Sequence, residues 1–326
     1  MGKIQKLWES IAYGGISVVN AIPFGLGSTM AVRLQAKVRA EIELGPGTIG
    51  IGHGLLDALR IYFRALGFPV TFYAFSDVPQ RQGLKSSSAI SVAAIKSALR
   101  LLGAEGIEGD EGEKGSDGVD ESDPPELSDI SREEMKKNPP PFQRRLLKIF
   151  GVNENNYREA FPPYLSAILS KASGLSVTGA LDDATAAYWG GVSFTDNTRM
   201  RIIKVVQPPK EVSVIIGVGG KRRVIDRVRL MSFADNFKRA FALAYSGDLY
   251  RAMNISGRTV AEAMGYDPEP ILGAYQRGAL ASGITGNGPA YFAIVAEGDE
   301  GPVLESWSKK VRGIIVTRPM EIESRN

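Results

Sequence analysis

The sequence predicts an α+β fold, and three observations carry this prediction. A run of alternating apolar residues over Met30–Leu44 indicates an extended strand. Apolar residues repeat with helical spacing over Ala89–Leu102 and Leu249–Met264, which indicates amphipathic helices. The remaining strand signals are short, and helices gathered on one face of mainly antiparallel strands are typical of the α+β class.

The first half of the chain mixes strands and helices. A β-rich run over Ala12–Ile22 precedes the long strand, and a second one covers Val70–Phe75. A helix is expected over Leu55–Leu66, and the pair Gly190-Gly191 is expected to end the last helix of this half. Three further helices are expected at about 142–150, at Tyr157–Ala172 and at Asp182–Trp189.

The second half begins with two short strands on either side of Pro208-Pro209. Three helical runs follow, then a Gly-rich turn, a strand, and a final helix and strand. The expected strands are Arg201–Val206, Val212–Val218, Ala290–Ala296 and Ile314–Thr317, and the expected helices are Met231–Ala244, Leu249–Met264 and Ile271–Ala281. At 326 residues the chain is long enough for two domains. We place an N-terminal domain at residues 1–195 and a C-terminal α+β domain at residues 196–326.

Residues 104–141 have the composition of an insertion in the N-terminal domain. The part from 104 to 138 holds 13 acidic and 4 basic residues, a net charge of −9, and three prolines follow it. With so little apolar surface to bury, the segment is expected to be largely disordered and to act as a solvated tether, with a specific binding tail as the alternative. The rest of the chain carries a net charge of +12, which favours anionic ligands such as nucleotides and also fits an RNA-binding surface.

Composition excludes several kinds of site. The chain has no Cys, which excludes disulfides, thiolate metal sites and a Cys nucleophile. Its single His, His53, lies in a Gly-rich loop before an expected helix, and we expect it to be structural. No apolar run approaches the roughly 20 residues that span a bilayer, and the N-terminus lacks the apolar segment of a signal peptide. We therefore expect a cytoplasmic protein with no membrane partner.

The segment with the clearest chemical meaning is Gly83-Leu84-Lys85-Ser86-Ser87-Ser88-Ala89, between a β-rich run and an expected helix. The free N–H groups at a helix N-terminus point at an anion, and the helix dipole favours negative charge there. Gly83 permits close backbone approach, Lys85 adds positive charge, and the serines offer hydroxyls to a phosphate or a metal. A Ser-rich helix cap without a ligand is the alternative.

Two further motifs fit a phosphate site. Asp182 and Asp183 begin an expected helix, where acids often serve only as caps, but a carboxylate beside a phosphate can also accept a hydroxyl proton or hold Mg²⁺. The turn Gly286-Asn287-Gly288-Pro289 either connects a helix to a strand or gives close backbone support to the phosphate loop.

Taken together and in this order, the motifs resemble those of the GHMP kinase superfamily. The superfamily pattern P-x-x-x-G-L-G-S-S-A is similar to the run from Pro79 to Ser88, with Lys85 in place of the second Gly of that pattern and Ser88 in place of its Ala. An Asp before a helix that ends in Gly-Gly matches Asp183, and a third Gly-rich motif matches the run from Gly286 to Ala293. The G-L-K-S-S-S-A form is similar to that of the archaeal shikimate kinases, and the resemblance covers almost the whole chain except the acidic insertion.

The resemblance implies a fold and a reaction. The fold would combine a ribosomal-protein-S5-like N-terminal domain with a ferredoxin-like C-terminal domain. The reaction would be phosphorylation of shikimate by ATP with Mg²⁺, a step of aromatic amino-acid biosynthesis. Two rival readings are another small-molecule kinase acting on homoserine or mevalonate and, from a different class, a non-catalytic RNA-binding protein; nucleic acid is the less favoured partner.

The same resemblance implies roles for individual residues. Asp183 would be the catalytic carboxylate, with Asp182 as its competitor, and Lys85 would stabilise charge on the transferred phosphoryl group. The loop from Gly83 to Ala89 would bind the ATP phosphates, while Ser87 and Asp183 would hold Mg²⁺. Asn20 and Ser17 are the expected contacts to the substrate.

Overall fold

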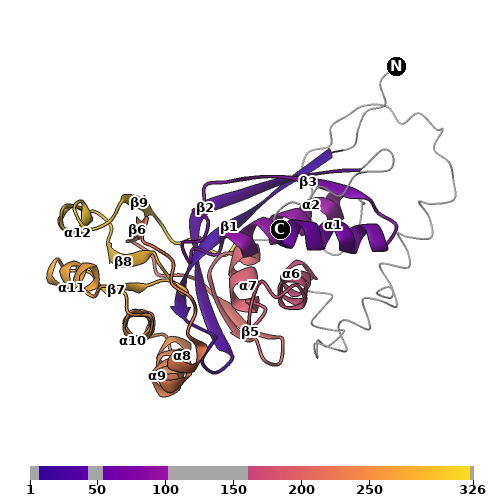
Figure 1. Cartoon of the computed structure of the whole chain (residues 1–326). Coiled ribbons are helices and arrows are strands. Elements are labelled where there is room, and N and C mark those ends of the chain that lie inside the picture. The colour runs from indigo at the N-terminus through magenta and orange to yellow at the C-terminus, as the bar shows by residue number, and fades with distance from the viewer. Residues whose placement is uncertain (1–6, 43–53, 102–160, 324–326) are drawn as a thin grey trace.

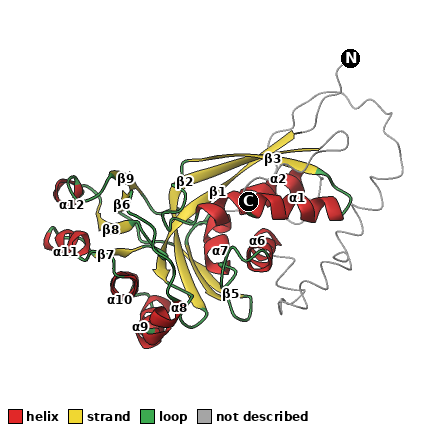
Figure 2. Ribbon diagram, viewed as in Figure 1, coloured by secondary structure: helices red, strands yellow, loops and turns green. Residues whose placement is uncertain are grey.

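The computed structural model describes residues 7–42, 54–101 and 161–323, which form two antiparallel sheets with helices packed on them (Figures 1 and 2). The first sheet has the order β1-β2-β4-β5, and β3 also pairs with β2. Its strands are β1 (Leu7–Val19), β2 (Leu26–Ile42), β3 (Val70–Ser76), β4 (Val192–Asp196) and β5 (Arg201–Val206). The helices α1 (Leu55–Ala65), α2 (Ser86–Leu101), α6 (Phe161–Ala172) and α7 (Leu181–Trp189) lie on one side of this sheet (Figure 1).

The second sheet has the order β7-β8-β6-β9. Its strands are β6 (Val212–Val218), β7 (Ala281–Ile284), β8 (Tyr291–Ala296) and β9 (Gly313–Thr317). Its helices are α8 (Arg227–Ser232), α9 (Ala234–Tyr245), α10 (Leu249–Met264), α11 (Glu269–Gln276) and α12 (Gly301–Trp307). Side chains alternate along β6 and β8, so that Phe292 packs toward α10 while Ile215 packs toward Trp307 of α12.

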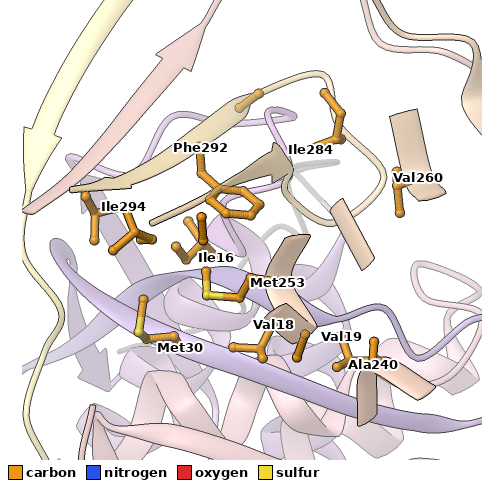
Figure 3. Close-up of a cluster of buried hydrophobic side chains, with 14 of the residues drawn as sticks. Ile16, Val18, Val19, Met30, Ala240, Met253, Val260, Ile284, Phe292 and Ile294 are labelled. Carbon is orange, nitrogen blue, oxygen red and sulfur yellow. The ribbon is translucent and has the colours of Figure 1, made fainter. Parts of the chain in front are cut away.

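One hydrophobic core joins the two sheets. Ile16 and Met30 from the first sheet pack in the same cluster as Phe292 of β8 and Met253 of α10 (Figure 3). All four side chains are at most 1% exposed. Because this cluster contains side chains from both units, the position of one sheet relative to the other is fixed by buried apolar surface.

The C-terminal segment returns to the first sheet. β2 pairs with β3 over residues 36–42 and with β4 over residues 26–30, which leaves a gap on the same edge. Residues 318–320 fill this gap: Arg33 N donates to Arg318 O, and Met320 N donates to Ala31 O, each at 2.9 Å. The last described residues therefore satisfy backbone groups of the N-terminal strands.

Most expected elements are present, and three runs coincide with their elements: β5, β6 and α10. Two short strands, β4 and β7, were not expected, because each has only four or five residues and contains Ser or Gly. The expected helix over Ile271–Ala281 is wrong at its end, since α11 stops at Gln276 and Ala281 already belongs to β7. The run over Met231–Ala244 is interrupted at Phe233, which separates α8 from α9.

The division between the sheets bears on the domain boundary. Residue 195 lies inside β4, and β5 pairs with β4, so the first sheet extends to Val206. The chain enters the second sheet at Val212. The boundary that we propose on this basis lies within residues 207–211.

The expected helix at 142–150, the acidic insertion and His53 lie outside the described residues. In the described ranges, no helix has both the length and the hydropathy to cross a bilayer.

Candidate active site

A cavity of about 80 Å³ lies where the two sheets meet. Segments far apart in the sequence line it, including the β1–β2 turn, the start of α7 and the β7–β8 turn. The lining residues that matter for chemistry are Ser17, Asn20, Lys85, Asp182, Asp183 and Asn287. All of these except Asn287 were individually expected at the site, and Asn287 lies in the expected Gly-rich turn, so the fold brings the three motifs to one place.

The two acids at the start of α7 have different surroundings. Asp183 Oδ1 lies 2.9 Å from Lys85 Nζ and accepts a 2.7 Å hydrogen bond from Thr29 Oγ1. The Asp183 side chain is 14% exposed and Lys85 is 10% exposed, so this ion pair borders the cavity. Asp182 is only 4% exposed. Of the two acids, Asp183 is the one accessible to a ligand.

Asp182 is held from several sides. Asn197 Nδ2 donates to its Oδ1 at 2.8 Å, and Ser193 Oγ donates to its backbone O at 2.8 Å. A Cβ at Gly27 would lie 2.6 Å from the Asp182 carboxyl carbon, so that position leaves room only for glycine. Burial, and secondly the charge of Asp183, raise the pKa of Asp182 to about 6. This arrangement makes Asp182 a packed acid beneath the accessible one.

Lys85 reaches Asp183 from an unusual backbone position. Its φ of 66° is left-handed, a conformation that costs a non-glycine residue about 1 kcal/mol or more. This geometry explains why the superfamily pattern has Gly at the same place. The side chain passes next to Gly15, where a Cβ would lie 3.5 Å from Lys85 Cγ. The ion pair with Asp183 offsets the backbone strain and directs a positive charge to the cavity.

The run that was expected to bind an anion lies at the N-terminus of α2. Gly83 has φ 81°, and a Cβ there would lie 2.3 Å from Thr285 O. Ala89 N donates to Lys85 O at 3.0 Å, so the N–H groups of the three preceding serines have no acceptor within the helix. Ser87 is exposed, whereas Ser88 and Ala89 are buried. Free N–H groups and the Ser87 hydroxyl are therefore the groups that this loop offers to an anion.

The Gly-rich turn lies between β7 and β8, not between a helix and a strand, and it contacts the loop as expected. Thr285 Oγ1 donates to Gly83 O at 3.0 Å, and Ala290 N donates to Gln82 O at 3.1 Å. Leu84 supports the other side, since its carbonyl accepts from Gly15 N at 3.1 Å and its side chain is 1% exposed. The expected phosphate loop is thus fixed between β1 and the β7–β8 turn.

Ser17 and Asn20 also contact this turn. Ser17 Oγ accepts from Gly286 N at 3.1 Å, and Asn20 Nδ2 donates to Gly286 O at 3.1 Å and to Asn287 Oδ1 at 2.9 Å. Both side chains are about 5% exposed. Their polar atoms position the cavity wall, and a substrate contact from either residue stays a proposal.

The donor set for a metal ion is sparse. Over the described residues, no cluster of three or more His, Cys, Asp or Glu side chains could hold one. Both protein contacts to the Asp183 carboxylate are made at Oδ1, and neither its Oδ2 nor Ser87 Oγ bonds to another described residue. A carboxylate oxygen and a hydroxyl suit Mg²⁺ that takes most of its ligands from phosphates and water.

Thr29, Asn197 and Tyr266 form hydrogen bonds to residues that line the cavity and were not expected from the sequence. Thr29 lies in the part of β2 that precedes the alternating run over Met30–Leu44, where no strand was expected. Asn197 follows β4, a strand that itself was missed. Tyr266 follows α10 and donates its O–H to Asn287 O at 2.8 Å. For Thr29 alone a weak signal existed, namely two consecutive hydroxyl residues, Ser28-Thr29, in an otherwise apolar run.

The sequence of this chain is similar to one protein family and to several characterised proteins. Residues 53–113 match the family model for the GHMP kinases N terminal domain. The shikimate kinase of Methanothermobacter thermautotrophicus is 27% identical over 314 residues, which cover 93% of this chain and 92% of that protein. The shikimate kinase of Methanobrevibacter smithii is 26% identical over 318 residues, which cover 94% of each.

A solved structure supports the fold. The homoserine kinase from Cytophaga hutchinsonii superposes with a TM-score of 0.60 at 14% identity, covering 99% of this chain and 98% of that one. At this identity the similarity is evidence for the fold and gives no information on the substrate.

Proposed function

We propose that this chain, which has the GHMP kinase fold and is similar over almost its whole length to archaeal shikimate kinases, phosphorylates shikimate with ATP. The products are shikimate 3-phosphate and ADP. The observation that carries the proposal is the Asp183–Lys85 pair at 2.9 Å, on a cavity next to the free N-terminus of α2. A proton acceptor, a cation and a phosphate-binding helix end are the groups that phosphoryl transfer requires.

The residues divide the reaction between them. The substrate hydroxyl oxygen forms a new bond to the γ-phosphorus while the bond from that phosphorus to the leaving ADP oxygen breaks. Asp183 accepts the hydroxyl proton, and Lys85 lies close enough to neutralise charge on the phosphoryl oxygens. The N–H groups at the start of α2 bind the phosphates of ATP.

Magnesium is part of the proposal. Asp183 Oδ2 and the Ser87 hydroxyl would hold the ion, which when bound neutralises phosphate charge. Lys85 orients Asp183 with or without the ion, because its ammonium contacts Oδ1.

The test is ADP release from MgATP with shikimate, homoserine and mevalonate offered separately. We expect turnover with shikimate alone, because a site built for a carboxylate and neighbouring hydroxyls rejects acceptors that leave its polar groups unpaired. Turnover with homoserine or mevalonate would support the kinase activity but contradict shikimate as the substrate. A folded protein that turns over none of the three, and that shifts RNA in a salt-dependent manner, would favour the RNA-binding alternative.

A further inference from the structure

The proposed acceptor carries a carboxylate, yet the cavity has no spare positive charge. Among the described residues that line it, Lys85 is the only cation, and its ammonium is already paired with Asp183. A carboxylate taken into such a site without a partner is strongly disfavoured. Its partner must therefore come from the rim of the cavity.

A basic segment follows β6 and is anchored beside the two Gly-rich loops. Gly219 N donates to Gln82 Oε1 at 3.1 Å, which ties its start to the phosphate loop. Gly220 packs against Pro289, because a Cβ at Gly220 would lie only 2.9 Å from Cβ of the Pro289 ring. The next three residues, Lys221, Arg222 and Arg223, are all exposed. The segment thus has three consecutive exposed cations that directly follow its contacts with the two Gly-rich loops.

Arg223 is linked to the cavity wall through one residue. Its N–H donates to Tyr266 Oη at 3.4 Å, and its guanidinium lies 5.4 Å from the centre of the Tyr266 ring. Tyr266 in turn donates to Asn287 O at 2.8 Å, and Asn287 lines the cavity. Burial raises the pKa of the Tyr266 hydroxyl, while the backbone hydrogen bond from Arg223 and the charges of Arg223 and Arg222 act in the opposite direction.

Arg229, further along the same segment, is engaged elsewhere. Arg229 donates to Glu262 O, and its backbone N–H is capped by Asp226. Within the described part of the chain, neither Arg222 nor Arg223 forms an ion pair with a carboxylate. Guanidinium groups bind carboxylates with two parallel hydrogen bonds, so an unpaired arginine beside a substrate cavity is suited to select an anionic acceptor.

We propose that Arg222 and Arg223 form the carboxylate-recognition site of this enzyme and select acidic acceptors over neutral ones. The inference rests on the proposed function, because it assigns a partner to the carboxylate of the proposed substrate. Because the two arginines act in binding the acceptor, we expect their removal to raise the KM for the acceptor and to leave the KM for ATP unchanged.

The experiment compares the wild type with R222A/R223A, using shikimate and its neutral methyl ester as acceptors. We expect the double variant to raise the KM for shikimate about 10- to 100-fold, to leave the KM for ATP within about twofold, and to lose discrimination against the ester. R222K/R223K keeps the positive charge but not the planar guanidinium. Its KM for shikimate should lie between those of the wild type and R222A/R223A. Arg227→Ala is the matched control, an exposed arginine of the same segment, and should behave as the wild type.

The outcomes separate the two proposals. Wild-type turnover of shikimate with an unchanged KM in the double variant overturns the arginine pair alone. A raised KM for ATP in place of shikimate also overturns it, because the pair would then bind nucleotide phosphates. Absence of wild-type turnover with shikimate overturns the proposed function, and the arginine assignment falls with it.

Discussion

Thr29 shows how single residues determine this site. Its side chain is fully buried, and its Oγ1 lies 2.7 Å from Asp183 Oδ1 and 3.2 Å from Asp182 Oδ2. A hydroxyl has one proton, and the shorter contact is the stronger hydrogen bond. Thr29 therefore orients Asp183, while Asn197 holds the buried partner at the other end.

Replacing Asp183 tests the central residue. We expect Asp183→Ala to lower kcat at least about 1000-fold, because it removes both the proton acceptor and the partner of Lys85. Steady-state ADP release measures this, with circular dichroism as a check on folding. Asp235→Ala is the control, an exposed acid paired only with Lys238, and should leave kcat unchanged. A near-normal kcat in Asp183→Ala would move the catalytic role to Asp182.

Replacing Thr29 tests whether its hydroxyl orients the Asp183 carboxylate. We expect Thr29→Val, which keeps the shape and removes the hydroxyl, to lower kcat about 10- to 100-fold through loss of a hydrogen bond to a charged group. The KM for the acceptor should change little. Thr29→Ser keeps the hydroxyl and should retain most of the activity. Equal losses in the Val and Ser variants would indicate a packing role instead.

Asp182 predicts a pH dependence of stability. Its pKa is raised from 3.8 to about 6, so between these values the folded protein holds a proton that the unfolded chain releases. The stability from this group is complete below pH 3.8 and is lost as the pH rises through about 6.

Asp182→Asn has no such proton to lose. We expect its free energy of unfolding, relative to the wild type, to increase from pH 4 to pH 7 by at most roughly 3 kcal/mol. Urea unfolding at several pH values measures the difference. Parallel pH profiles for the two proteins would show that Asp182 has an ordinary pKa in the folded state.

At the scale of elements, the phosphate loop depends on contacts with β1 and with the β7–β8 turn. The contact at Gly83 is the tightest, because a Cβ on this residue would clash with the carbonyl oxygen of Thr285. The loop cannot move away without breaking its hydrogen bonds to Gly15, Thr285 and Ala290. The helix end is therefore held rigidly, which favours precise phosphate positioning.

Gly83→Ala should distort this loop, and Gly67→Ala is its matched control. Both glycines have a left-handed φ, 81° and 86°, but a Cβ at Gly67 meets nothing within 4 Å. We expect Gly67→Ala to cost about 1 kcal/mol with unchanged kinetics. Gly83→Ala should cost more and raise the KM for ATP more than about tenfold. Thermal unfolding and ATP titration measure both effects, and equal behaviour of the two variants would contradict the role given to the loop.

At the scale of the whole molecule, a shared core fixes the cavity. Ile16 and Met30 of the first sheet pack with Phe292 and Met253 of the second unit (Figure 3), and residues 318–320 return to β2. The cavity lies at this junction, with Asp183 from one unit and Asn287 from the other. Its geometry therefore depends on how the two sheets are packed.

The acidic insertion gives a prediction at this scale. We expect deletion of residues 106–138 to change kcat and KM by less than about twofold, because its composition offers little surface to bury. A full-length variant with the acids of this segment changed to Ser is the control for charge. A large loss of kcat in the deletion, without loss of folding, would show that the segment takes part in function.

Local pattern determined much of this protein. Alternation and helical spacing located β5, β6 and α10 with their observed bounds, since these signals depend on neighbouring residues. The residue types and order of the loop from Gly83 to Ala89 and of the acids at the start of α7 likewise predict a phosphate site, and the structure shows that both segments begin helices. Short strands such as β4 and β7 carry too few residues for such a signal.

Tertiary structure alone decided the roles within the site. Asp182 and Asp183 are neighbours of the same type, and only burial makes the first a packed acid and the second an accessible one. Thr29 and Asn197 gain their roles from contacts across more than 150 residues and 15 residues of sequence, respectively. The physical reason is that periodicity is a property of adjacent residues, whereas exposure, charge pairing and pKa depend on which distant segments pack together.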